Sequence, residues 1–134
     1  MKALVISYGS IGRRHAEVLD SMDDLKKIVI LSSQSSLPFE TITSMDNILN
    51  FNPDYIVIAS PTSRHYEQLK FLENNFKDKK ILVEKPLFEK HHELGILKNK
   101  VFVGYNIRFN PVVQKIKKTI ADRSLWNLHV FCGS

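Results

Sequence analysis

The stretch Ser7-Tyr-Gly-Ser-Ile-Gly12 follows an apolar run at residues 3–6 and precedes a segment with helical spacing of its apolar residues. A Gly-x-Gly-x-x-Gly turn between a strand and a helix holds the pyrophosphate of a dinucleotide. Here Ser7 stands at the position of the first glycine. Gly9 would let the backbone approach a pyrophosphate, and Gly12 would let the helix pack close to the strand. The stretch therefore predicts a dinucleotide site, with a bare glycine turn as the alternative.

Short apolar runs recur along the chain and indicate the fold class. They are rich in β-branched residues, lack polar alternation and lie at residues 3–6, 28–31, 55–59, 81–83 and 101–103. Such runs are typical of strands buried on both faces of a parallel sheet. Apolar residues at helical spacing follow the first, third and fifth runs, and a weak strand near 40–43 and a short helix near 45–49 follow the second. We predict an α/β fold with a doubly wound, mostly parallel Rossmann sheet.

Composition excludes several classes of protein. The chain has 134 residues, 43% of them apolar and 25% charged, as expected for one globular domain. No apolar run reaches the roughly 20 residues needed to span a bilayer, so we predict a cytoplasmic protein with no membrane partner. The net charge is +5, and part of the positive excess lies in short lysine groups without interleaved aromatic residues, which indicates solvated surface and no nucleic-acid partner. With one cysteine and no zinc-type spacing, no metal site is predicted.

The loops after the strands are where an open parallel sheet binds ligands. After the second run come Ser32, Ser33 and Gln34, where an NAD site usually has an acidic residue for the ribose hydroxyls. These serines with Arg13 or Arg14 could instead accommodate the 2′-phosphate of NADP, so the residues leave NAD and NADP both open. The alternative is that this loop is only polar surface.

Two later loops carry further candidates. In Ser60-Pro-Thr-Ser-Arg-His65, Pro61 shapes the turn, and Thr62 or Ser63 can cap the next helix. Glu84-Lys-Pro86 places a charged pair at the end of the fourth run. Lys85 there could act as a general acid or base or bind a substrate hydroxyl, against the alternative of an ordinary surface lysine.

Four motifs together resemble the nucleotide-binding domain of the Gfo/Idh/MocA oxidoreductases. They are Gly9-Ser-Ile-Gly-Arg-Arg-His15, Ser60-Pro-Thr-Ser-Arg-His65, Glu84-Lys-Pro86 and Gly104-Tyr-Asn-Ile-Arg-Phe-Asn-Pro111. The resemblance implies a domain that binds NAD or NADP for hydride transfer at a carbinol carbon of a sugar-like small molecule. It also implies a homo-oligomeric full-length protein. Ser7 and the missing acidic residue depart from the family pattern.

The resemblance also implies roles for individual residues. Lys85 would be catalytic and would touch the substrate hydroxyl, and Arg108 would lie on the substrate side. The implied cofactor-binding residues, together with the two serines of the second loop, are Gly9, Ser10, Ile11, Gly12, Ser32, Ser33, Ser60, Pro61, Thr62, His65, Glu84 and Asn106.

Family members are more than twice as long, because a second α/β domain completes the substrate pocket. We therefore expect a Rossmann domain over residues 1–121, and the first strand of a truncated second domain within residues 122–134. On this interpretation the chain alone would have little or no activity. The alternative is a non-catalytic module that senses nucleotides or binds a partner and keeps the same fold.

Overall fold

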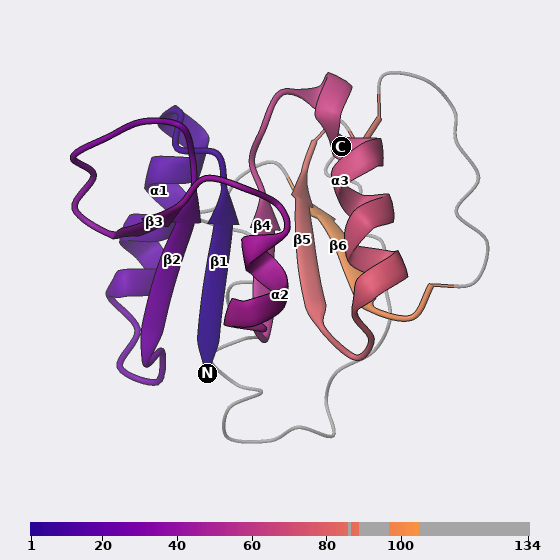
Figure 1. Ribbon diagram of the computed structural model, residues 1–134, viewed down its shortest axis with the longest axis horizontal. Helices are drawn as coiled ribbons and strands as arrows, with labels where there is room; N and C mark the ends of the chain where they lie inside the picture. Colours follow the sequence, from indigo (N-terminus) through magenta and orange to yellow (C-terminus); the bar gives the residue numbers. More distant parts are fainter. Residues whose placement is uncertain (86, 89–96, 105–134) are drawn as a thin grey trace.

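The computed structural model describes residues 1–85, 87–88 and 97–104. Strands and helices alternate along most of this part of the chain (Figure 1). The strands are β1 (Lys2–Ile6), β2 (Lys27–Leu31), β3 (Glu40–Ile42), β4 (Tyr55–Ile58), β5 (Lys80–Glu84) and β6 (Lys100–Gly104). The helices are α1 (Ser10–Asp20), α2 (Asn47–Phe51) and α3 (Thr62–Asn75).

The six strands form one sheet in the order β3-β2-β1-β4-β5-β6, and every pair of neighbours is parallel. The chain winds outward from β1 to β3, then crosses back to place β4 on the other side of β1. This is the strand order of a Rossmann fold, in which a ligand crevice opens where the order reverses. The predicted fold class is confirmed, and the reversal point lies between β1 and β4.

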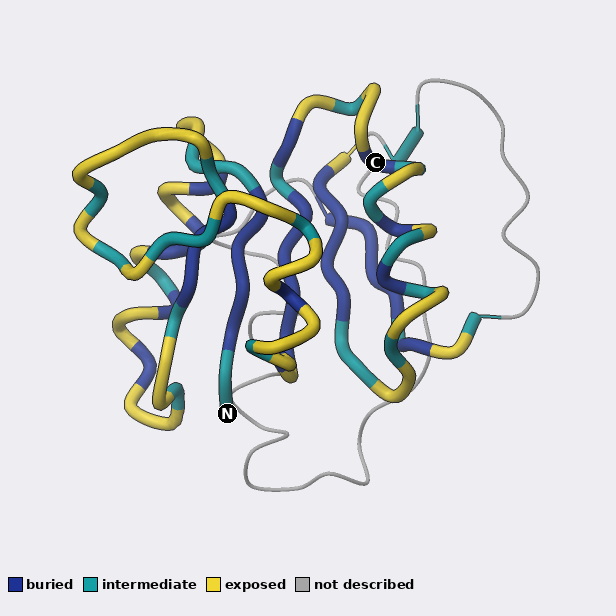
Figure 2. The backbone as a smooth tube through the Cα atoms, viewed as in Figure 1, coloured by how far each residue is buried: buried dark blue, intermediate teal, exposed yellow. Residues whose placement is uncertain are grey.

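The strands other than β3 are largely buried because helices cover both faces of the sheet. Ala3 and Val5 of β1 share a core cluster with Ala16 and Leu19 of α1. The alternate residues Leu4 and Ile6 belong to a second cluster, to which α2 contributes Ile48 and α3 contributes Leu69 and Leu72. Successive side chains of a strand point to opposite faces, so an uninterrupted apolar run serves both clusters. Figure 2 shows the strands as the buried centre and the helices as half-exposed layers.

The five apolar runs coincide with β1, β2, β4, β5 and β6, and the weak strand is β3. The short helix begins at Asn47, two residues later than predicted. The helix expected after the fifth run, the domain boundary at residue 121 and the strand expected at residues 126–131 lie outside the described residues. In the part of the chain that the structure describes, no helix is long and apolar enough to cross a membrane.

Tyr55 at the start of β4 places a polar atom in the core beneath α1. The side chain is fully buried, and its hydroxyl has no hydrogen-bond partner among the described residues. Burial, and secondarily the negative charge of Glu84, raise the pKa of Tyr55. The phenol of Tyr55 is therefore protonated and neutral, and the nearby Glu84 charge adds to the effect of burial.

Candidate dinucleotide site at the carboxyl edge of the sheet

The turn after β1 has the backbone conformation of a glycine turn although it begins with serine. Ser7 has a φ of 83°, in the left-handed region that non-glycine residues rarely adopt. Its N–H donates to the Leu31 carbonyl oxygen at 2.8 Å, which ties the turn to the end of β2. The serine side chain thus occupies the position where the fingerprint needs glycine, at a cost in backbone strain.

Gly12 is required by close packing within the protein. A Cβ atom built on Gly12 would lie 2.0 Å from the Ser7 carbonyl oxygen and 3.6 Å from the Ala59 Cβ. A contact of 2.0 Å with backbone has no flexible side chain that can give way, so any other residue would push α1 off the turn. The expected role of Gly12 in helix–strand packing is therefore visible in the geometry.

Gly9 is different, because no contact with the described residues requires it to lack a side chain. A Cβ built there meets no atom within 4 Å, and its φ of −76° suits any residue. Gly9 is the N-cap of α1, no side chain caps the helix, and its first turn carries no acidic residue. The helix amides and the positive end of the helix dipole therefore face open space, which fits an anion such as a pyrophosphate.

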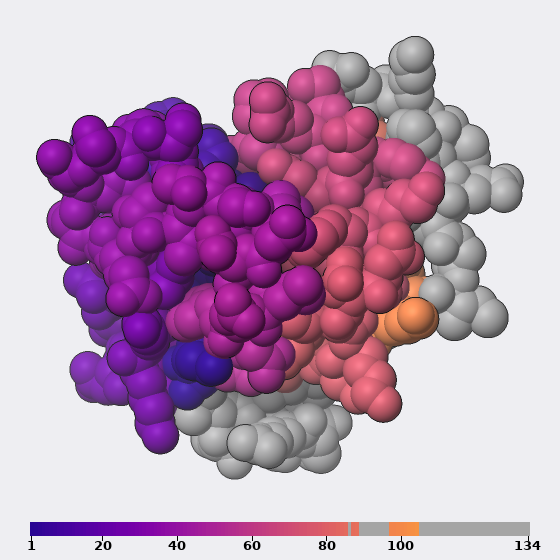
Figure 3. Space-filling view, viewed as in Figure 1, coloured from indigo at the N-terminus to yellow at the C-terminus, as the bar shows by residue number. Residues whose placement is uncertain are grey.

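A cavity of about 460 Å³ opens beside this turn, at the carboxyl ends of β1, β2 and β4. In Figure 3 the purple segment after β2 and the pink start of α3 flank this edge of the sheet. Hydroxyl, amide and apolar groups dominate the wall. The lining residues are Ile6, Ser7, Leu31, Ser32, Ser33, Gln34, Thr43, Met45, Ser60, Pro61, Arg64 and Gln68.

Two of the predicted segments meet in this cavity. Ser32 and Ser33 line it from the end of β2, and Ser60 and Pro61 line it from the end of β4. The Ser32 hydroxyl accepts from the Gln34 N–H at 3.0 Å, and the Gln34 side-chain amide donates to the Tyr8 carbonyl oxygen at 3.2 Å. Four further lining residues were not predicted from the sequence: Thr43, Met45, Arg64 and Gln68.

The loop between β4 and α3 departs from one expectation. Pro61 is the N-cap of α3, the helix begins at Thr62, and no side chain makes a capping hydrogen bond. The predicted capping by Thr62 or Ser63 is therefore wrong, because proline already provides the extended entry to the helix with a φ of −56°. The Ser60 hydroxyl instead donates to the Gln68 side-chain oxygen at 2.5 Å.

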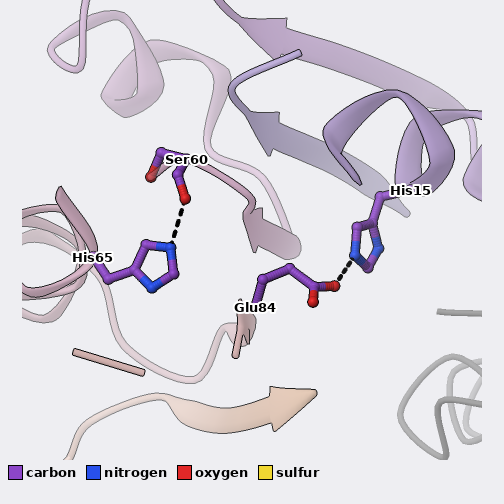
Figure 4. Close-up of polar contacts among 4 residues, drawn as sticks. All are labelled: His15, Ser60, His65 and Glu84. Carbon is purple, nitrogen blue, oxygen red and sulfur yellow. Dashed lines mark hydrogen bonds and ion pairs between the residues drawn. The ribbon is translucent and has the colours of Figure 1, made fainter. Parts of the chain in front are cut away.

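His65 is a buried link between two loops at this edge. Its Nε2 lies 2.7 Å from the Ser60 carbonyl oxygen (Figure 4). Its Nδ1 lies 3.0 Å from the Leu87 carbonyl oxygen. Carbonyl oxygens only accept, so a neutral imidazole donates to one of them and an imidazolium to both. The histidine thereby holds the β4–α3 loop against the segment that follows Lys85.

Glu84 points to the other face of the sheet, toward α1. Its carboxylate pairs with Nε2 of His15, and both residues are buried (Figure 4). Removing one side chain of such a buried pair would leave the other buried without a partner, which destabilises the fold. The pair therefore joins the helix of the glycine turn to β5. The structure thus places Glu84 beside α1 and not among the residues that line the cavity.

Lys85 follows immediately at the carboxyl end of β5. Its side chain is exposed, and its N–H donates to the Gly104 carbonyl oxygen of β6 at 2.8 Å. Neither Lys85 nor the residues Thr62 and His65 line the cavity. Asn106 and Arg108 lie outside the described residues. Within residues 1–85, 87–88 and 97–104, no three His, Cys, Asp or Glu side chains gather to hold a metal ion.

The strand order, the close glycine contact and the open helix N-terminus define a Rossmann domain with a dinucleotide site. The family model GFO_IDH_MocA, described as an oxidoreductase family with an NAD-binding Rossmann fold, matches residues 1–101. The chain therefore belongs to the Gfo/Idh/MocA oxidoreductases, and this part of it is their NAD-binding domain. No curated protein sequence matches the chain significantly.

Solved structures share the same fold. YvaA from Bacillus subtilis is 25% identical, with a TM-score of 0.67 over 94% of this chain and 41% of that one. Scyllo-inositol dehydrogenase from Lactobacillus casei, solved with NAD(H) and scyllo-inositol, is 18% identical, with a TM-score of 0.67 over 95% and 42%. The WlbA dehydrogenase from Bordetella pertussis, solved with NADH and UDP-GlcNAcA, is 19% identical, with a TM-score of 0.62 over 90% and 41%. The chain thus spans about two-fifths of the length of these proteins.

The strain at Ser7 leads to a stability prediction. Replacing Ser7 with glycine removes the left-handed penalty of the side chain but makes the unfolded chain more flexible. We expect Ser7→Gly to raise the free energy of unfolding by about 0.5–1 kcal/mol, measured by urea denaturation. Ser10→Gly, at an ordinary helical position, is the matched control and should lower stability. A loss of stability in Ser7→Gly would contradict the strained turn.

Proposed function

We propose that the chain is the cofactor-binding part of a dehydrogenase that transfers hydride to or from a carbinol carbon of a sugar, nucleotide sugar or cyclitol. The observation that carries the proposal is the contrast between the two glycines: Gly12 is needed by the fold, whereas a side chain at Gly9 would meet no described atom, which leaves space for a ligand. Because the chain spans about two-fifths of its solved relatives, the reaction belongs to the whole protein.

The cofactor would lie along the carboxyl edge of the sheet. Its pyrophosphate would rest on the amides at Gly9, Ser10, Ile11 and Gly12, where the N-terminus of α1 is uncapped. The cavity between the loops after β2 and β4 has space for the adenosine end, with Ser32, Ser33, Ser60 and Pro61 in its wall. Thr62 would complete the β4 side of the site.

His65 and Glu84 would support the site from inside the protein. Both side chains are buried and already make polar contacts, His65 with the Ser60 and Leu87 carbonyl oxygens and Glu84 with His15. We propose that they bind the cofactor indirectly, by fixing the loops that touch it. For these two residues, the proposal replaces the direct cofactor contact implied by the family resemblance with indirect support.

Lys85 would carry the proton chemistry of the reaction. A nicotinamide bound at this edge would exchange a hydride with the carbinol carbon of the substrate. Lys85 would hold the hydroxyl of that carbon; as the C–H hydride leaves, the hydroxyl proton passes to the amine and the carbonyl forms. In the reverse direction the ammonium returns the proton to the oxygen. Its exposed position next to the buried Glu84 suits contact with a substrate.

The proposed substrate class is supported by two structural relatives. One was solved with UDP-GlcNAcA and the other with scyllo-inositol, and both molecules carry ring hydroxyls on carbinol carbons. A homo-oligomeric full-length protein and a cytoplasmic location stay predictions. Asn106 and Arg108, implied on the nicotinamide and substrate sides, also stay predictions.

The cofactor site is tested by filling the space over Gly9. Aspartate is a favourable N-cap residue, so Gly9→Asp should fold as well as the parent, while its carboxylate takes the place of the pyrophosphate. The parent should gain about 2.7 kcal/mol of stability from NADH or NADPH at 100 times the dissociation constant, seen as a thermal shift. Gly9→Asp should show no shift with either cofactor.

Gly9→Asn is the matched variant, since its side chain fills the same space without the negative charge. Comparison of the two variants separates steric exclusion of the pyrophosphate from its electrostatic repulsion. A Gly9→Asp variant that binds both cofactors like the parent would contradict a pyrophosphate site at this turn. No shift of the parent with either cofactor would contradict the proposed function altogether.

The role of Lys85 is tested by hydride transfer. The assay follows NAD(P)H absorbance with a panel of sugars, nucleotide sugars and cyclitols, on this chain and on any longer product of the same gene. Lys85→Met should lower kcat by about 10²–10⁴-fold, as expected for a lost proton-transfer group, with cofactor affinity unchanged. Lys79→Met, at the opposite edge of the sheet, is the control. Unchanged kcat in Lys85→Met would contradict the role.

A further inference from the structure

The described wall of the cavity between the loops after β2 and β4 carries a positive charge and no negative charge. Among the described residues that line the cavity, none is aspartate or glutamate, and one, Arg64, is a cation. In sites for unphosphorylated NAD, a carboxylate at the end of the second strand usually accepts from the ribose hydroxyls. The described wall of this cavity offers hydroxyl and amide groups there in place of a carboxylate.

Arg64 is placed to serve a ligand in this cavity. It lies in the first turn of α3, and its N–H donates to the Pro61 carbonyl oxygen at 2.9 Å. Its side chain is exposed and makes no ion pair among the described residues. The positive end of the α3 dipole lies at the same position, so the cation and the helix both favour an anion there.

The opposite wall can complete a phosphate site. The half-buried Ser32 hydroxyl accepts from the Gln34 N–H, which leaves its own proton to donate, and the exposed Ser33 adds a second hydroxyl. Because both serines and Arg64 line the same cavity, they could donate to one phosphate group from two sides. A carboxylate at Ser32 or Ser33 would repel such a group.

The arginines of α1 are less suited to this role. Arg13 is paired with Glu17 at 2.8 Å, and this hydrogen bond and charge raise the pKa of Arg13. Neither Arg13 nor Arg14 lines the cavity. From the sequence, we expected Arg13 or Arg14 to accompany the serines at a 2′-phosphate. In the structure, Arg64 of α3 is better placed for this role.

We propose that Arg64, together with Ser32 and Ser33, binds the 2′-phosphate of the adenosine ribose and gives the protein a preference for NADP over NAD. The proposal rests on the proposed function, since it assumes that the cavity holds the adenosine end of a dinucleotide. Arg64 is the specificity-determining residue of this site, and the guanidinium can hold two phosphate oxygens at once.

The test uses two probes that differ only in the 2′-phosphate, 2′,5′-ADP and 5′-AMP, titrated calorimetrically into the chain. The parent should bind 2′,5′-ADP about 10- to 100-fold more tightly, the range expected for hydrogen bonds to a charged group. Arg64→Gln should remove this preference while binding of 5′-AMP stays within about twofold. Arg14→Gln, an exposed arginine outside the cavity, should keep the preference.

A second variant approaches the same site from the β2 side. Ser33→Asp introduces a carboxylate, which the described wall of the cavity lacks. The variant should therefore bind 2′,5′-ADP and NADPH more weakly and NADH more tightly than the parent. Equal affinity of the parent for the two probes, or loss of the preference in Arg14→Gln with retention in Arg64→Gln, would overturn the Arg64 proposal alone. A chain that binds neither probe and neither dinucleotide would instead overturn the proposed function.

Discussion

The contact between Gly12 and the Ser7 carbonyl oxygen is the constraint on which the rest of the site depends. With no side chain at Gly12, α1 begins directly against the turn after β1, where a Cβ would have come within 2.0 Å of that oxygen. The same approach sets the open N-terminus of the helix beside the crevice at the strand-order reversal. It also turns the buried face of α1, which includes His15 one turn later, toward the sheet.

His15 connects α1 to the segment that contains the proposed catalytic lysine, Lys85. Its buried pair with Glu84 joins α1 to the end of β5, and Lys85 is the next residue along the chain. On the other face His65 joins the loop after β4 to Leu87, two residues beyond Lys85. The segment around Lys85 is thus held by one histidine from each helical layer. The glycine turn and the Glu84-Lys85 segment are therefore joined at one edge of the sheet, although 69 residues separate His15 from Glu84.

Much of the fold was predictable because the information is local. Uninterrupted apolar runs specify strands covered on both faces, and the glycine turn specifies where the first helix begins. The boundaries of α2 and the capping of α3 were less accurate. In α3, proline provides the helix entry, so the adjacent hydroxyls are not needed as caps. The left-handed φ of Ser7 follows from the turn and not from its own preference.

The site was only partly predictable because burial and pairing are tertiary properties. Glu84 and His65 have the residue types of ligand-binding groups, but the structure directs both toward buried partners. Arg64 was hidden inside a recognised motif, and only the fold of α3 against the loop after β2 brings it to the cavity. The signal that could have found it is its place in the first turn of a helix that follows a strand at the ligand edge.

We propose that a dinucleotide lies along the carboxyl edge of β1, β2 and β4. The most direct measurement is a titration of the ¹⁵N-labelled chain with NADPH, following each backbone amide by NMR. We expect the largest shifts at residues 7–12, 32–34 and 60–64, with little change at Lys98 and Lys100 on the opposite edge of the sheet. Shifts that leave residues 7–12 unchanged, or that centre on the opposite edge, would contradict it.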